Sequence, residues 1–218
     1  MDQTDNIQET FLGSLDRAQA QSEPFRHWLL EDVFPAATCR TVSRLPFEPP
    51  AVDDTLGKRE THNSTRTFFS PENRSRFAVC DALAKTLQSE PTVSRLSRQC
   101  GVDLQGSYLR IEYCQDTGAF WLEPHTDIGA KLFTLLVYLS EGPGSEDWGT
   151  DIYTADGAHL GRAPYGLGRG LIFVPGTDTW HGFERRPIEG VRKSLIVNYV
   201  KDEWRARHEL AFPLRPVS

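Results

Sequence analysis

The run KLFTLLVYL at residues 131–139 has the β-branched and aromatic composition of a buried β-strand. Because side chains alternate between the two faces of a strand, residues 134, 136 and 138 share one face and residues 133, 135 and 137 share the other. The first face carries two hydroxyl groups, from Thr134 and Tyr138, which suits the interior of a barrel that holds a polar ligand. The alternative is that Tyr138 only extends its hydroxyl group to the rim of the barrel.

Similar short runs recur along the second half of the chain, separated by turns rich in Gly and Pro. They cover residues 108–113, 149–153, 170–174 and 193–200. Several short β-branched and aromatic strands with such turns are typical of a β-sandwich or barrel.

Three residues of this region could bind one metal ion. In extended backbone the side chains of His125 and Asp127 project to the same side and can reach one cation. His181 follows His125 by 56 residues and comes just after the run 170–174, so a strand end would present it. Two imidazoles and one carboxylate fill three of the six positions around a non-heme Fe(II) and leave an open face for a co-substrate and O₂. A lone histidine is more often a surface residue than a ligand, so the prediction requires all three residues to meet.

An ordered set of features around these residues resembles a known family. In chain order they are Tyr113, Gly118, His125-Thr126-Asp127, residues 134–139, Trp148-Gly149-Thr150, Phe173-Val174-Pro175, His181-Gly182 and Arg192-Lys193-Ser194. The set resembles the Fe(II)/2-oxoglutarate-dependent oxygenases, specifically their prolyl-hydroxylase-like branch. The resemblance covers roughly residues 105–200, with a weaker echo at residues 25–46, where such proteins often carry an entry strand and a helix.

The resemblance implies a mainly β fold with α-helices: a double-stranded β-helix, or cupin-like jelly roll, with supporting N-terminal helices. It also implies that His125, Asp127 and His181 are the metal ligands and therefore the catalytic residues. For the distal carboxylate of 2-oxoglutarate it implies four binding candidates, of which the last two are the weaker: Arg192, Tyr138, Ser194 and Tyr113.

Arg192 also suits a carboxylate on chemical grounds, since a planar guanidinium can donate two parallel hydrogen bonds to it. Lys193 is the adjacent alternative, and strand alternation allows only one of the two to enter the barrel. Both faces of this strand are largely apolar, so alternation does not choose between them. The resemblance favours Arg192.

The activity that the resemblance implies is that of a dioxygenase, in particular a hydroxylase. It would use Fe(II), 2-oxoglutarate as co-substrate and O₂, release succinate and CO₂, and take ascorbate as a candidate reductant. Asp127 favours hydroxylation, because relatives that halogenate replace this carboxylate with a small residue. We expect a small-molecule substrate such as an amino acid or another metabolite. The alternatives are a protein prolyl or other side-chain hydroxylase, a cupin-type metal isomerase or lyase, and a non-catalytic binding protein.

We expect residues 1–218 to form a single oxygenase domain. Residues 1–104 would provide mainly helical support and a substrate-side loop, residues 105–200 the jelly-roll core, and residues 201–218 a C-terminal tail. Ser70-Pro71-Glu72 predicts a helix start, with the hydroxyl group as cap and proline in the first turn. Residues 77, 80, 83, 84 and 87 then form one apolar face, and residues 93–99 predict a short second helix that ends near Gly101.

Residues 46–69 are polar and poorly periodic. They either fold over the pocket, with His62 and Arg66 as candidate substrate contacts, or form an ordinary surface loop. Trp148 likewise has two interpretations, since it could line the substrate mouth or cap the core. Arg162 and Tyr165 have the same two interpretations.

The composition bounds the partners and the compartment. The 24 Lys and Arg residues against 30 Asp and Glu give a net charge of −6, which argues against nucleic acid as a partner. No apolar run reaches the length of a membrane span, and the N-terminus lacks the pattern of a signal peptide, so we expect a cytoplasmic protein without a membrane partner. Cys39, Cys80, Cys100 and Cys114 are scattered and are expected to be reduced thiols.

Overall fold

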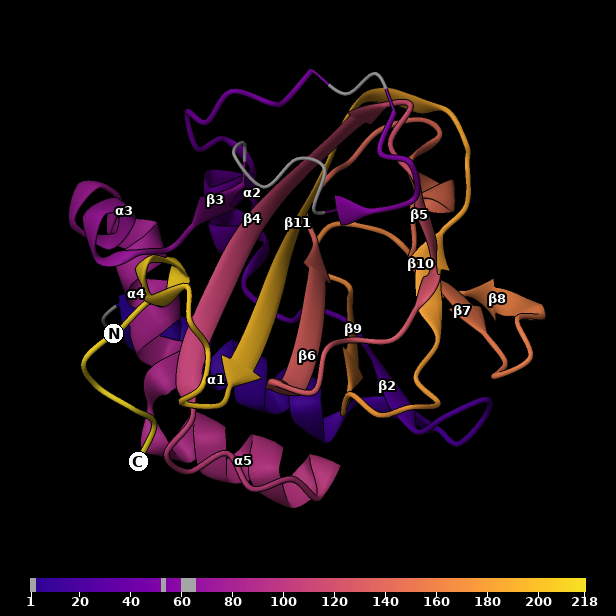
Figure 1. Ribbon diagram of the computed structural model, residues 1–218. Coiled ribbons are helices and arrows are strands. Elements are labelled where there is room, and N and C mark those ends of the chain that lie inside the picture. Colours follow the sequence, from indigo (N-terminus) through magenta and orange to yellow (C-terminus); the bar gives the residue numbers. More distant parts are fainter. Residues whose placement is uncertain (1–2, 52–53, 60–65) are drawn as a thin grey trace.

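Two antiparallel sheets form the centre of the protein in the computed structural model, which describes residues 3–51, 54–59 and 66–218 (Figure 1). The larger sheet has seven strands, in the order β1 (Gln19–Gln21), β2 (His27–Leu30), β9 (Gly170–Phe173), β6 (Lys131–Tyr138), β11 (Ile188–Val200), β4 (Tyr108–Gly118) and β3 (Thr67–Phe68). The smaller sheet has four strands, in the order β5 (Leu122–His125), β10 (His181–Phe183), β7 (Asp151–Tyr153) and β8 (His159–Arg162).

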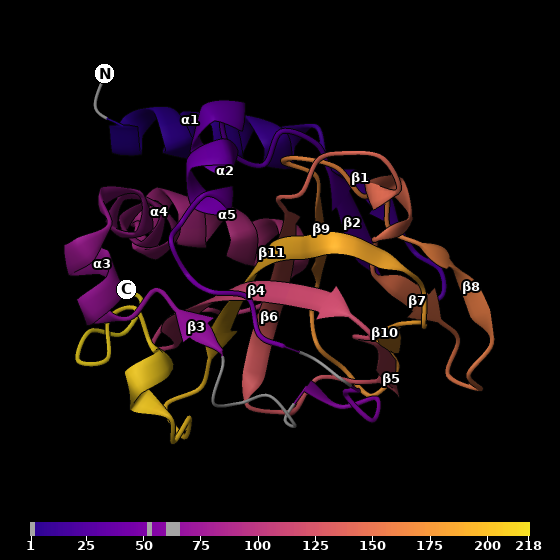
Figure 2. The same ribbon diagram turned by 90° about the horizontal axis from the view of Figure 1, so that it is seen from above.

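Five α-helices come from the N-terminal half of the chain: α1 (Gln3–Asp16), α2 (Ala36–Ser43), α3 (Pro71–Arg76), α4 (Ala78–Gln88) and α5 (Glu90–Cys100). Two short 3₁₀ helices, η2 (Ser145–Asp147) and η3 (Arg207–Glu209), follow in the C-terminal half. Figure 2 shows α1, α2, α4 and α5 on one face of the large sheet, while the smaller sheet lies on its other side. The layers are therefore helix, large sheet and small sheet.

Strand alternation divides the apolar side chains between two cores. Phe133, Leu135 and Val137 of β6 point toward the helices and join the larger core. Leu136 and Tyr138 point the other way and pack with residues of the smaller sheet, such as Phe183. The polar residues of the central strands share this second, inner face. The space between the two sheets is thus where a polar ligand can be held.

The double-stranded β-helix with supporting helices is confirmed. The predicted helix start at Ser70 is also present, because the Ser70 hydroxyl group accepts a hydrogen bond from the Asn73 amide, although Phe77 separates α3 from α4. The second predicted helix is α5, which Gly101 ends in the left-handed conformation at φ 70°. The entry strand and helix expected within residues 25–46 are β2 and α2.

The N-terminal segment contributes two strands beyond the helical support, the loop and the entry strand that we expected. Besides β2, both β1 and β3 come from it and are hydrogen-bonded members of the large sheet. Runs as short as TF at residues 67–68 carry too little periodicity to be assigned as strands from sequence.

The four cysteines are buried free thiols, as expected. Burial raises the pKa of Cys39 to about 11 and that of both Cys80 and Cys100 to about 12. None of the helices in the described part of the chain combines the length and the apolar character that crossing a bilayer would need.

Candidate metal centre

His125 and His181 face each other across two neighbouring strands. They are direct partners in the antiparallel pair β5–β10, so their side chains leave the sheet on the same face. The ring centroids are 4.5 Å apart. Gly182 allows this approach, because a Cβ atom at that position would lie 2.9 Å from the Leu122 carbonyl oxygen. The pairing of two strands that are far apart in sequence thus brings the two imidazoles together.

Backbone carbonyl groups fix how the two rings are protonated. His125 Nδ1 lies 2.8 Å from the Glu123 carbonyl oxygen, and His181 Nδ1 lies 2.9 Å from that of Thr179. A carbonyl oxygen can only accept, so in the neutral form of each ring Nδ1 carries the proton and Nε2 keeps its lone pair. Metal-ligating histidines have this arrangement, in which the second nitrogen donates to a carbonyl group.

Asp127 supplies the carboxylate of the predicted set. Its Oδ2 accepts a hydrogen bond of 2.7 Å from the Thr134 hydroxyl group, and its Oδ1 pairs with the ammonium group of Lys131. Burial of the carboxyl group disfavours ionisation, but the Lys131 ammonium and the other contacts outweigh it and lower the pKa of Asp127 to about 2. Burial, together with the neighbouring His125 ring, lowers the pKa of His181 to about 4. Near neutral pH both groups are therefore in the protonation state that a cation requires.

A second group of candidate ligands lies on the smaller sheet. Among the described residues, only Asp151, His159 and Glu184 bring three ligand atoms within 4.8 Å of one another. However, Asp151 already accepts hydrogen bonds from Arg162, Arg186, His159 and the Glu184 amide. By proximity this group could hold an ion, but two guanidinium groups already compensate its buried carboxylate. The ligand atoms of His125, Asp127 and His181 do not all lie within 4.8 Å of one another. Asp127 is bonded to Lys131 and Thr134.

The predicted ligands share one cavity with a volume of about 380 Å³. Of the sequence-predicted site residues, His125, Asp127, His181, Arg192 and Ser194 line it. From the segment 46–69, Arg66 lines it too, as do Gly57, Lys58 and Arg59, whereas His62 lies outside the described residues. Part of this segment thus borders the cavity.

Arg192 enters the space between the sheets, while Lys193 points to the helix side. The Arg192 guanidinium donates to the Trp148 carbonyl oxygen at 2.7 Å and pairs with the buried carboxylate of Asp116. Arg59 pairs with the same carboxylate at 3.2 Å. Lys193 Nζ donates instead to the Ser43 carbonyl oxygen. The geometry thus makes the choice that strand alternation alone left open.

Tyr138 and Tyr113 do not line the cavity. The Tyr138 hydroxyl group donates to Thr150 Oγ1 at 2.9 Å and accepts from the Thr150 amide, so it is bonded to a residue that itself lines the cavity. Tyr113 is paired with Leu195 in the register of β4 and β11, which places it on the helix face, where it donates to Ser43. In both cases the placement disagrees with the predicted contact to a co-substrate.

Sequence reasoning missed several polar residues of the cavity and its wall. Arg110, Glu112 and Asp116 lie at alternate positions of β4 and share the inner face. Arg66 and Arg110 both pair with Glu112, and these contacts lower the pKa of Glu112 although burial alone would raise it. The period-two spacing of charged residues in an otherwise apolar strand is a signal that could have identified this polar face.

Trp148 and Tyr165, which the sequence placed either at the substrate mouth or in the core, belong to the core. Trp148 is 4% exposed and donates its indole N–H to the Pro187 carbonyl oxygen. Tyr165 stacks on Tyr138 with ring centroids 4.6 Å apart. Arg162 pairs with Asp147 and Asp151, away from the cavity.

Comparison with known proteins supports the fold at low sequence identity. No protein-family model matches the chain, and no curated protein matches it in sequence. Among solved structures, a prolyl 4-hydroxylase from Phytophthora capsici has a TM-score of 0.60 at 12% identity, over 94% of this chain and 68% of that one.

Two further solved structures, a second prolyl hydroxylase and an epimerase, match to a similar degree. A prolyl hydroxylase from Trichoplax adhaerens, in complex with a hypoxia inducible factor peptide fragment, has a TM-score of 0.56 at 15% identity over 93% of both chains. The non-heme alpha ketoglutarate dependent epimerase SnoN from nogalamycin biosynthesis has a TM-score of 0.55 at 15% identity, over 97% of this chain and 94% of that one. The chain therefore has the fold that these prolyl hydroxylases share with an alpha ketoglutarate dependent epimerase.

Proposed function

We propose that the protein is a non-heme Fe(II)- and 2-oxoglutarate-dependent dioxygenase that hydroxylates a small molecule. The observation that carries the proposal is the cross-strand pair of His125 and His181. Both rings have Nδ1 committed to a carbonyl group and Nε2 free to ligate, and both share a cavity with Asp127. Two imidazoles and one carboxylate are the donor set that suits Fe(II) with open positions.

Each residue of the centre has a defined part in this proposal. His125, Asp127 and His181 would hold the metal. When bound, Fe(II) with 2-oxoglutarate and O₂ supplies the oxidising power to hydroxylate a C–H bond. The Thr179 and Glu123 carbonyl groups keep the rings oriented. The Lys131 ammonium group pairs with Asp127, and a bound metal ion would replace part of this interaction.

Arg192 would bind the distal carboxylate of 2-oxoglutarate. Its side chain is buried and is positioned by the Trp148 carbonyl group and Asp116. Within the described residues, Arg192 Nη2 donates no hydrogen bond, so one terminal nitrogen can serve a ligand. Because Asp116 is shared by Arg59 and Arg192, this end of the cavity has more positive than negative charge. Ser194 lines the same cavity and is a second candidate contact.

The cavity also favours a small substrate that carries an acidic group. Among the described residues, five cationic side chains line it, against three carboxylates, or four with the neighbouring Asp116: Lys58, Arg59, Arg66, Lys131 and Arg192 against Glu112, Glu123 and Asp127. Fe(II) and the two carboxylates of 2-oxoglutarate carry equal and opposite charge, so loading the centre would leave this balance unchanged. Trp204 lines the cavity too, and its buried indole N–H meets no acceptor within the described part of the chain. A substrate carboxylate would satisfy such donors.

The first experiment measures succinate formed from 2-oxoglutarate by the protein loaded with Fe(II) in air. We expect succinate formation that requires both Fe(II) and O₂. A protein that binds Fe(II) but forms no succinate with any substrate would instead favour a cupin-type isomerase or lyase, or a binding protein.

A second experiment tests the substrate class. Small carboxylic acids, each paired with its primary amide, are compared for stimulation of succinate formation, with a proline-containing peptide beside them. We expect acids to stimulate turnover and their amides to do so at least tenfold less, since the amide keeps the shape but loses the charge. Stimulation by the neutral peptide alone would support the alternative of a protein side-chain hydroxylase.

A further inference from the structure

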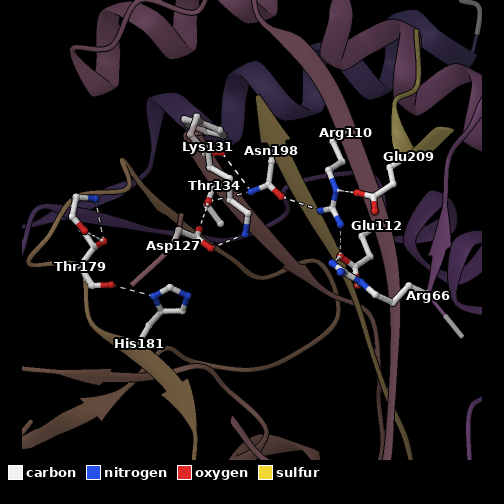
Figure 3. Close-up of polar contacts among 12 residues, drawn as sticks. Arg66, Arg110, Glu112, Asp127, Lys131, Thr134, Thr179, His181, Asn198 and Glu209 are labelled. Atoms are coloured by element: carbon white, nitrogen blue, oxygen red, sulfur yellow. Dashed lines mark hydrogen bonds and ion pairs between the residues drawn. The ribbon is translucent and has the colours of Figure 1, made fainter. Parts of the chain in front are cut away.

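A chain of hydrogen bonds runs through the space between the sheets from Asp127 to Arg110 (Figure 3). Thr134 Oγ1 donates to Asp127 Oδ2 at 2.7 Å, and Asn198 Nδ2 donates to Thr134 Oγ1 at 2.9 Å. Arg110 Nη1 then donates to Asn198 Oδ1 at 3.0 Å. The strand register explains the contact, since Asn198 of β11 pairs with Arg110 of β4 on one side and with Thr134 of β6 on the other.

The direction of every hydrogen bond in this chain is determined by its far end. A guanidinium group has only donors, so the Asn198 atom that faces Arg110 must be the carbonyl oxygen. The amide nitrogen of Asn198 therefore faces Thr134 and donates to its hydroxyl oxygen. The Thr134 proton is then left for the Asp127 carboxylate, which can only accept. Reversing the Asn198 amide would bring two donors together at Arg110.

Arg110 is itself held firmly. It is 1% exposed, its Nε donates to Glu209, and its Nη2 donates to Glu112 at 2.9 Å. The guanidinium carbon also lies 4.7 Å from the centroid of the Phe68 ring. A buried guanidinium is costly unless its donors are satisfied, and here carboxylate and amide oxygens satisfy them. The far end of the chain is thus fixed independently of the metal centre.

We propose that Arg110 and Asn198 are positioning residues for the metal centre. They impose the orientation of the Thr134 hydroxyl group, and that group holds the Asp127 carboxylate in place for the cation. The inference rests on the proposed function, because it takes Asp127 to be a metal ligand. It goes further in assigning a role to three buried polar residues on neighbouring strands. A purely structural network would stabilise the sheet without affecting metal affinity.

The test is the dissociation constant for Mn(II), measured by titration of the metal-free full-length protein without 2-oxoglutarate. Thr134→Val removes the donor to Asp127, and Thr134→Ser is the matched control that keeps it. We expect Thr134→Val to weaken Mn(II) binding by at least about tenfold, as for other partners that orient metal ligands, and Thr134→Ser to stay within about twofold of wild type. The thermal unfolding midpoints of the two metal-free variants check that both are folded.

Asn198→Asp tests the direction of the chain. A carboxylate at this position accepts from both Arg110 and Thr134, so the Thr134 proton turns away from Asp127. The added negative charge alone would strengthen cation binding. We expect the loss of the hydrogen bond from Thr134 to outweigh the added charge, so that Mn(II) binding is weaker than in the wild type.

Equal Mn(II) affinity in the valine and serine variants would overturn the role of Thr134. Binding as tight as wild type, or tighter, in Asn198→Asp would overturn the roles of Arg110 and Asn198. A wild-type protein that binds no Mn(II) or Fe(II) would instead overturn the proposed function, and this inference with it.

Discussion

Asp127 and Asp151 are two buried carboxylates, each beside histidine, in surroundings of opposite character. Asp127 has a lysine and a hydroxyl group as partners and faces a cavity that two imidazoles share. Asp151 is 0% exposed and is bonded to two arginines, a histidine and an amide. The ligand atoms around Asp151 lie closer together, yet the Asp151 carboxylate already accepts four hydrogen bonds. A metal site therefore needs available lone pairs and an accessible cavity as well as ligand atoms that lie close together.

The largest expected effect separates these two clusters. Asp127→Asn and His181→Gln should lower 2-oxoglutarate turnover by more than about 100-fold, since losing a ligand exceeds the 10- to 100-fold cost of losing a ligand's partner. His159→Gln and Glu184→Gln change the other cluster and should keep turnover within about twofold. Both pairs of variants are compared by their rate of succinate formation and by their Mn(II) affinity in a titration. Full activity in Asp127→Asn, or its loss in Glu184→Gln, would reverse the assignment.

A second prediction uses two neighbours on β11 that face opposite sides of the sheet. Arg192→Met removes a buried charged partner, which costs on the order of 2 to 5 kcal/mol, so the KM for 2-oxoglutarate should rise by at least about 25-fold. Mn(II) affinity should stay nearly constant. Lys193→Met is the control, because Lys193 contacts Ser43 on the helix side. An unchanged KM in Arg192→Met would remove Arg192 from the co-substrate site.

Tyr138→Phe should have a smaller effect and of a different kind. The variant loses the hydrogen bonds between Tyr138 and Thr150, which contribute about 1 kcal/mol each to the free energy of unfolding. The KM for 2-oxoglutarate should remain within about twofold of wild type. A large rise in KM with unchanged stability would restore the contact that the sequence predicted.

The smallest expected effect concerns His27, a third imidazole whose Nδ1 faces a carbonyl group two residues earlier. Burial lowers the pKa of His27. As the pH falls below the ordinary histidine pKa of about 6.5, His27 binds a proton in the unfolded chain but not in the folded protein. The free energy of unfolding therefore decreases as the pH falls through this range. In His27→Gln the free energy of unfolding of the metal-free protein should decrease less steeply between pH 7 and pH 5. The same change at exposed His208 is the control, and an equal slope in both variants would contradict the prediction.

The residues of the proposed metal centre could be singled out in the sequence because their spacing and their strand context are local signals. His125 and Asp127 are two residues apart, and His181 follows a buried strand that ends in a Pro-Gly turn. The pairing of β5 with β10, which sets the two histidines face to face, is a long-range contact. Only the ordered family resemblance provided it at the level of sequence.

Register explains what could not be predicted. Tyr113 and Ser194 were both candidates for one pocket, but Tyr113 pairs with Leu195, so the two lie on opposite faces of the sheet. Within β4, the alternating charges of Arg110 and Glu112 could have placed Tyr113 opposite the polar face, but the way β11 pairs with β4 is a long-range contact that neither strand reveals. The partner of Arg192 could not be predicted for the same reason, because Asp116 becomes a buried counter-ion only through its pairing with β11.

The most direct test of the account is the position of the metal in a crystal of the Mn(II)-loaded protein, located by anomalous diffraction. We expect a single strong peak in the cavity, within ligand distance of Nε2 of His125, Nε2 of His181 and the Asp127 carboxylate. A peak beside Asp151, His159 and Glu184, with none in the cavity, would contradict the account.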